Sequence, residues 1–140
     1  MAAAGLDPHA YPNWLGGLQV VAAMFFRMTG ERTVKLRLET TNDDGCRRYH
    51  VDRSYLRLLC TYRGKGTEWL GDAQVDRAAL GARAPNERIV RFGGPSRLGR
   101  FWVGLFKGSL HPHTALGGLV HRSPPIAGTG QLRVRLCLDC

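Results

Sequence analysis

The chain of 140 residues lacks the features that mark several large classes of protein. It has no internal repeat, no heptad pattern and no low-complexity segment, which excludes solenoids, coiled coils and long linkers. Its most apolar stretch, residues 14–26, is too short to span a bilayer, and its first residues show no secretory leader. We therefore expect a cytoplasmic protein with no membrane segment, folded as a single domain over residues 1–140.

Cysteines and catalytic motifs are also scarce. The four cysteines, Cys46, Cys60, Cys137 and Cys140, do not have the spacing of a secreted disulfide framework. The C-x-x-C pair at the C-terminus has no second pair for a zinc ribbon and opens no helix for a thioredoxin-like site. G-x-S-x-G, H-E-x-x-H and the phosphate-binding loop are absent, so no catalytic residue follows from a motif.

Lysine is rare as well, because only three of the twenty basic residues are lysines and seventeen are arginines. The net charge is +9, but the arginines are scattered and no basic run exceeds two residues. A basic barrel that binds nucleic acid would need these arginines on one face with exposed aromatics between them. The composition does not favour nucleic acid, and we expect a small molecule or another substrate as partner. The oligomeric state stays open.

The periodicity predicts a mainly β protein. Apolar residues at helical spacing predict a helix at about residues 10–30, and Gly30 ends it. The segment 33–40 alternates, so Leu36 and Leu38 are predicted on one face and Arg37 and Glu39 on the other. A helix is predicted over 72–80, and seven or eight short strands with glycine and proline turns fill the rest, one of them at 87–92. We expect a double-stranded β-helix, a jelly-roll or cupin-like barrel, as the core at 33–139.

One pair of side chains stands out as a candidate metal site. His50 and Asp52 are two residues apart in CRRYHVD, and on a strand such residues share a face. His121 in GGLVHRSPP is predicted on another strand, near its end. Two histidines and one carboxylate form the facial triad that holds non-haem Fe(II) with three open positions. The structural alternative is a hydrogen-bonded His–Asp pair without metal.

A 2-oxo acid co-substrate would need a cation for its far carboxylate, ideally a guanidinium. Arg133 and Arg135 follow His121 on the last predicted strand, and spacing does not choose between them. Cys46 is a possible fourth ligand, in which case tetrahedral zinc would replace iron. The H-P-H pair His111 and His113 is interpreted as a surface turn.

These segments carry a family resemblance. CRRYHVD, LRLLCTYRGKGTEWL, LFKG, GLVHRSPP and the terminal RVRLCLD follow one another over residues 30–139 and resemble the domain of unknown function 1826 family, which is mostly bacterial. The matching motif positions are Cys46, His50, Asp52, Thr67, Glu68, Trp69, His121, Arg122 and Ser123. Family members have more chain before the first strand, so this sequence is expected to be N-terminally short. Arg135 stands where an apolar residue is usual, which favours Arg133 as the carboxylate anchor.

The resemblance implies a cupin-like or 2-oxoglutarate-dependent oxygenase fold. Together with the residues, it predicts a metal-dependent oxygenase with Fe(II) on His50, Asp52 and His121 and 2-oxoglutarate on Arg133. The alternative is a non-catalytic protein that handles Zn(II), since some family members lie beside genes of metal homeostasis. The organic substrate is not indicated.

Overall fold

The computed structural model describes residues 13–114 and 116–140. Eleven elements follow one another in this part of the chain. They are α1 (Trp14–Thr29), β1 (Lys35–Thr41), β2 (Leu56–Arg63), β3 (Glu68–Leu70), the short 3-10 helix η1 (Asp72–Gln74), α2 (Arg77–Gly81), α3 (Asn86–Ile89), β4 (Ser96–Arg97), β5 (Val103–Lys107), β6 (Val120–Arg122) and β7 (Arg133–Asp139).

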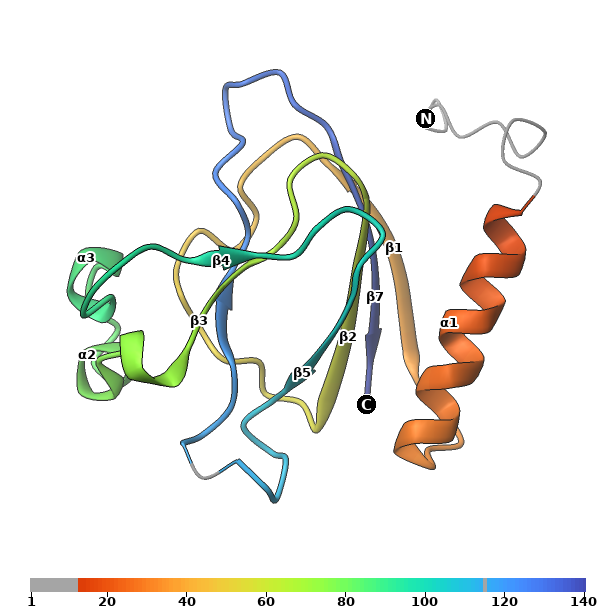
Figure 1. Cartoon of the computed structure of the whole chain (residues 1–140), viewed down its shortest axis with the longest axis horizontal. Helices are drawn as coiled ribbons and strands as arrows, with labels where there is room; N and C mark the ends of the chain where they lie inside the picture. The colour runs from red at the N-terminus through yellow and green to blue at the C-terminus, as the bar shows by residue number, and fades with distance from the viewer. Residues whose placement is uncertain (1–12, 115) are drawn as a thin grey trace.

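The strands form two antiparallel sheets, so the prediction of a mainly β protein with an N-terminal helix is confirmed (Figure 1). The larger sheet has the order β1-β7-β2-β5 and the smaller one β4-β3-β6. An isolated bridge between His50 and His121 places the segment before β2 against β6. No closed barrel joins the two sheets within residues 13–114 and 116–140.

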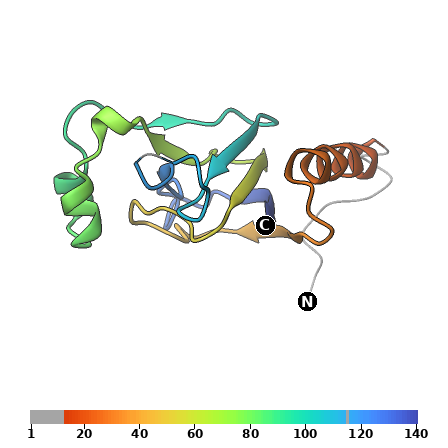
Figure 2. The same cartoon turned by 90° about the horizontal axis from the view of Figure 1, so that it is seen from below.

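Helix α1 packs on the outer face of the larger sheet (Figure 1, Figure 2). Phe25 is fully buried against leucines of β2 and β7, and Leu18, Val21 and Ala22 lie on the same side of the helix. Gly30 ends the helix with φ +68°, a left-handed conformation that favours glycine. Among the described residues, no helix combines the length and the apolar character that crossing a bilayer requires.

The first strand has the opposite orientation from the one that its apolar residues suggest. Leu36 and Leu38 are 51% and 39% exposed on the outer face, whereas Arg37 and Glu39 turn inward and take part in ion pairs. The reason is tertiary: β1 is an edge strand that α1 does not cover, and its inner face adjoins a cavity lined mainly by charged and polar side chains. The predicted separation of the two sets of residues is therefore observed, and the apolar set lies on the more exposed face.

The segment between β3 and β4 also differs from the prediction. The expected helix at 72–80 is divided into η1 and α2, and the expected strand at 87–92 is helix α3. Pro85 suits the start of a helix, and its carbonyl oxygen accepts hydrogen bonds from the next turn. Ile89 and Val75 are buried in one cluster with Leu70, and the helices lie beyond β3, away from α1 (Figure 2).

Two local features hold the loops in place. Gly66 follows the bend before β3, and a Cβ atom there would overlap the backbone carbonyl oxygen of Leu98. The Asp44 carboxylate accepts hydrogen bonds of 2.6 Å from the backbone N–H groups of Ile126 and Ala127. These bonds, chiefly the one from Ala127, lower the pKa of Asp44 and tie the turn after β1 to the loop before β7.

Candidate metal centre

The three predicted ligands lie together. His50, Asp52 and His121 each offer one ligand atom, and these atoms all lie within 4.8 Å of one another. Asp52 Oδ1 is 3.6 Å from His50 Nε2, and Asp52 Oδ2 is 3.1 Å from His121 Nε2. They are the one such group of three or more possible ligands in the described part of the chain. That they bind metal stays a prediction.

Backbone pairing across the two sequence segments brings the imidazoles together. His50 and His121 exchange two backbone hydrogen bonds of 3.0 Å each, and their ring centroids are 4.5 Å apart. His121 belongs to β6, but the segment around His50 is no regular strand and carries only this bridge. The two histidines are therefore brought together by one antiparallel bridge and not by the pairing of two long strands.

The hydrogen bonds of the imidazoles set their tautomers. His50 Nδ1 lies 2.8 Å from the carbonyl oxygen of Arg48, and His121 Nδ1 lies 3.1 Å from that of Leu119. A carbonyl oxygen only accepts, so each Nδ1 must carry a proton. The lone pair of each neutral ring is then on Nε2, and both Nε2 atoms face Asp52. In metalloproteins, a hydrogen bond from the ring nitrogen that does not bind the metal orients the histidine ligand.

The Oδ2 atom of Asp52, which faces His121, has no hydrogen-bond donor. It is buried without a hydrogen-bond partner, although His121 Nε2 is 3.1 Å away. Two acceptors at this distance repel each other unless a proton or a metal cation lies between them. Burial opposes ionisation of Asp52, but the imidazoles of His121 and His50, when they are protonated, and the charge of Arg57 outweigh burial and lower the pKa of Asp52.

The observed distances fit a shared metal ion. Two ligand atoms at about 2.1 Å from an ion are about 3.0 Å apart when they subtend a right angle and about 3.4 Å apart at a tetrahedral angle. The 3.1 Å between Asp52 Oδ2 and His121 Nε2 lies in this range, and the three ligand atoms all lie within 4.8 Å of one another, so side-chain movements would bring the third to the same ion. The donor set of two imidazole nitrogens and one carboxylate oxygen suits iron or zinc.

A network of arginines and acids surrounds the triad. Arg57 holds Asp52 Oδ1 through Nη1 at 2.5 Å and also bonds Asp139 of β7. Arg37 bonds the other oxygen of Asp139 at 2.6 Å, and Arg135 pairs with Glu39. Arg57 thus binds the same oxygen, Oδ1, that lies near His50 and leaves Oδ2 facing His121.

A cavity of about 300 Å³ opens beside the triad. Its lining includes His50 and His121, the two hydroxyl residues Thr67 and Ser123, and Cys46. Cys46 is exposed, and its sulfur does not belong to the cluster of ligand atoms. The protein therefore supplies three close ligands in this structure, not four.

The structure distinguishes the two candidate arginines by their partners. Arg135 is neutralised by Glu39, whereas Arg133 is 3% exposed and forms no ion pair among the described residues. Arg133 Nη2 donates to Thr67 Oγ1 at 2.6 Å, and Nη1 is 3.5 Å from Ser123 Oγ. Its Nε atom is buried without a partner. Burial lowers the pKa of Arg133 from 12.5 to about 10.

Sequence reasoning missed part of this site. Arg57 was not singled out, although it orients Asp52, because a single arginine in a strand carries no signal of its role. Thr67 and Ser123 were marked only as family motif positions, without a function. The detectable signal was the alternation of charged residues along β1 and β7, which the sequence alone does not assign to an inner or an outer face.

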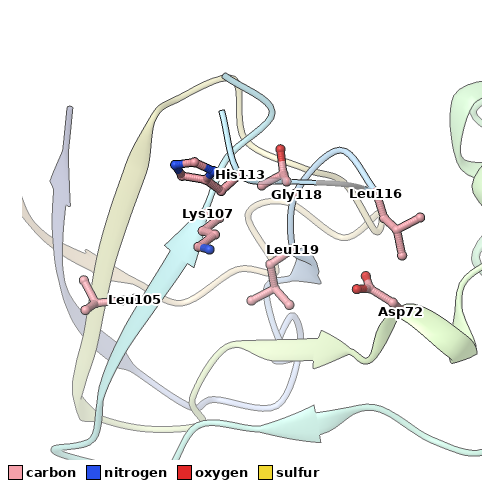
Figure 3. Close-up of a pocket in the computed structure, with 8 residues that line it drawn as sticks. Asp72, Leu105, Lys107, His113, Leu116, Gly118 and Leu119 are labelled. Carbon is pink, nitrogen blue, oxygen red and sulfur yellow. The ribbon is translucent and has the colours of Figure 1, made fainter. Parts of the chain in front are cut away.

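A second cavity, of about 450 Å³, lies beside β5, and none of the three triad residues lines it (Figure 3). Leucines 105, 116 and 119 line it together with Lys107, His113 and Asp72. The two histidines of the H-P-H turn do not converge on an acid: His111 stacks on Tyr55, and its Nδ1 accepts from the backbone N–H of His113. This cavity has less of the chemistry of a metal site than the one beside His121.

Comparison with known proteins places the chain in a family. The family model described as "Protein of unknown function (DUF1826)" matches residues 1–139. The chain belongs to this family. The DUF1826 match contains α1, both sheets and all three residues of the triad. No curated protein and no solved structure gives a significant match.

Proposed function

We propose that this DUF1826 protein is a metal-dependent oxygenase of the Fe(II)/2-oxoglutarate type. The observation that carries the proposal is the arrangement of three buried or half-buried atoms. When both imidazoles are neutral, their Nε2 lone pairs point toward Asp52, whose Oδ2 atom is buried without a hydrogen-bond partner. A divalent cation on these atoms removes the repulsion and satisfies all three.

The strand order supports a jelly-roll interpretation of the fold. When the bridged segment at His50 is counted as a strand, eight strands lie in two sheets of four. The chain alternates between the sheets except at β3 and β4, which are neighbours in the smaller sheet. A jelly roll has eight strands in two sheets, so this strand count and order support the proposal.

The number of close ligands favours iron over structural zinc. A closed zinc site uses four protein ligands, whereas a triad leaves positions for a co-substrate and dioxygen. Bound iron would supply activation of dioxygen, with 2-oxoglutarate as the reductant. The protein's own part is to orient the ligands through Arg57 and the two carbonyl acceptors, and to keep water away with Phe106, whose ring packs edge-on against His121.

Arg133 is the proposed anchor for the far carboxylate of 2-oxoglutarate. A buried guanidinium without an acidic partner is costly, and a carboxylate ligand would neutralise it through two parallel hydrogen bonds. The hydroxyl groups of Thr67 and Ser123, which already bond Arg133, line the cavity beside the triad and provide further donors.

Zinc handling without turnover is the second candidate. Cys46 lies on the same cavity as His50 and His121, in a segment next to Gly45, whose φ is +53°. A rotation that brings its sulfur to the metal would complete a tetrahedral Cys-His₂-Asp set.

The test compares the wild-type protein with His121→Ala and with His113→Ala, a control that removes a histidine from the distant turn. Each protein is purified without oxygen, its metal content is measured after loading with Fe(II) or Zn(II), and decarboxylation of 2-oxoglutarate is assayed. We expect one equivalent of iron and slow decarboxylation in the wild type and the control, and neither in His121→Ala. Tight stoichiometric zinc without decarboxylation would favour the second candidate. Equal metal contents in all three proteins would reject the centre.

A further inference from the structure

His50 separates two cavities. One is the cavity beside the triad, and the other is an open cavity of about 600 Å³ on the side of helix α2. Three arginines, Arg48, Arg77 and Arg83, line this outer cavity, and none of the described residues that line it is acidic. A molecule in the outer cavity would therefore lie directly beside a ligand of the proposed metal.

The three guanidinium groups are not fully neutralised. Arg48 and Arg83 form no ion pair among the described residues, and Arg48 Nη2 donates only to the carbonyl oxygen of Ala84 at 3.0 Å. Arg77 pairs with Asp72 at 2.6 Å, outside the cavity lining, and its Nε atom is buried without a hydrogen-bond partner. Positive charge in a concave site attracts anions, and guanidinium groups match phosphate and carboxylate oxygens.

The backbone at Arg83 adds an independent observation. Arg83 follows the end of α2 with φ +55°, a left-handed conformation that is uncommon for residues other than glycine. Glycine is the usual residue at this position after a helix because it has no Cβ atom to strain. An arginine held there at a conformational cost is consistent with a function for its side chain.

We propose that the outer cavity binds the anionic group of the substrate, a phosphate or a carboxylate on a small molecule. The assignment of this anion as the substrate rests on the proposed function, because His50 would connect the cavity to the metal. The argument for an anion site does not depend on the metal, because it comes from the arginines that line the cavity. Two sources, phosphate esters and carboxylic acids, share the chemistry, and the experiment separates them.

The test titrates inorganic phosphate and, in a separate arm, acetate into protein treated with a chelator, at constant ionic strength, with binding followed by NMR chemical shifts. The first variant is Arg83→Gly, since glycine adopts φ +55° without strain and its folding should not suffer. Arg48→Ala is the second variant. Arg91→Ala removes an equal charge from an exposed residue that does not line the cavity and serves as the control.

We expect each cavity variant to weaken binding of one or both anions about tenfold, as the loss of one charge-assisted hydrogen bond predicts, and Arg91→Ala to leave it unchanged. If the cavity variants weaken the binding of phosphate alone, the cavity is a phosphate site. If they weaken the binding of acetate alone, it is a carboxylate site. Absence of binding, or equal weakening by Arg91→Ala, overturns the proposal. Iron content is measured in the same variants and should stay at the wild-type level, so a failure of the metal centre is seen separately.

Discussion

Replacement of Arg133 by methionine tests the role of the buried guanidinium most directly. Burial lowers the pKa of Arg133 from 12.5 to about 10. At 1.36 kcal/mol for each pH unit, the charged form costs the ligand-free protein about 3 kcal/mol. Methionine has a similar volume and no charge, so it removes this cost. It also loses the 2.6 Å hydrogen bond to Thr67, worth about 1.5 kcal/mol because the donor is charged, and the long 3.5 Å contact with Ser123, which is worth less. The net expectation is a gain of about 1–2 kcal/mol in the free energy of unfolding.

The order of stability should reverse when 2-oxoglutarate is present. A ligand at one hundred times its dissociation constant stabilises the protein that binds it by about 2.7 kcal/mol, and Arg133→Met should gain nothing. Urea unfolding of both proteins, with Fe(II) and without oxygen, measures the free energies with and without 2-oxoglutarate. Arg135→Met is the matched control: it breaks the pair with Glu39 and should lower stability but keep the response to 2-oxoglutarate. A ligand-free Arg133→Met that is less stable than the wild type by more than about 2 kcal/mol, or equal stabilisation of both proteins by 2-oxoglutarate, would refute the reasoning.

Two further predictions concern the loops that hold the site. Gly66→Ala should lower the free energy of unfolding by about 2–3 kcal/mol, because its Cβ atom would displace backbone, whereas Gly94→Ala, with open space around it, should stay within about 0.5 kcal/mol. Equal urea midpoints for the two variants would contradict this. For Asp44 the folded pKa is lowered, so its contribution to stability is present above the unfolded pKa of about 3.9 and is lost as the pH falls through the folded value. Asp44→Asn should therefore have a lower Tm at pH 7 and a flatter Tm profile between pH 5 and 3 than the wild type, and parallel profiles would argue against the bonds to the loop before β7.

Much of the candidate site was visible in the sequence. His50, Asp52 and His121 were chosen by residue type and spacing, and the structure brings them together. Their placement was predictable because a histidine and an acid two residues apart need only one antiparallel bridge to a later histidine. The choice of Arg133 over Arg135 was suggested by family resemblance and stays a prediction: Arg135 pairs with Glu39, but Arg135 and not Arg133 lines the cavity beside the triad. The partners Thr67 and Ser123 were not assigned, because a hydroxyl group in a loop gives no sign of what it bonds.

The sequence by itself determined the local structure: helix α1 with its glycine stop, the predominance of short strands and the His-x-Asp pair. These follow from periodicity and backbone preference, which act over a few neighbouring residues. Only the tertiary structure decided which face of each strand is inside. Leu36 and Leu38 point outward and Arg37 and Glu39 inward, because the inner face of β1 adjoins the mainly charged and polar cavity beside the triad and α1 covers only the central strands. The alternation of a strand gives two faces, and the packing of distant elements decides which of them is buried.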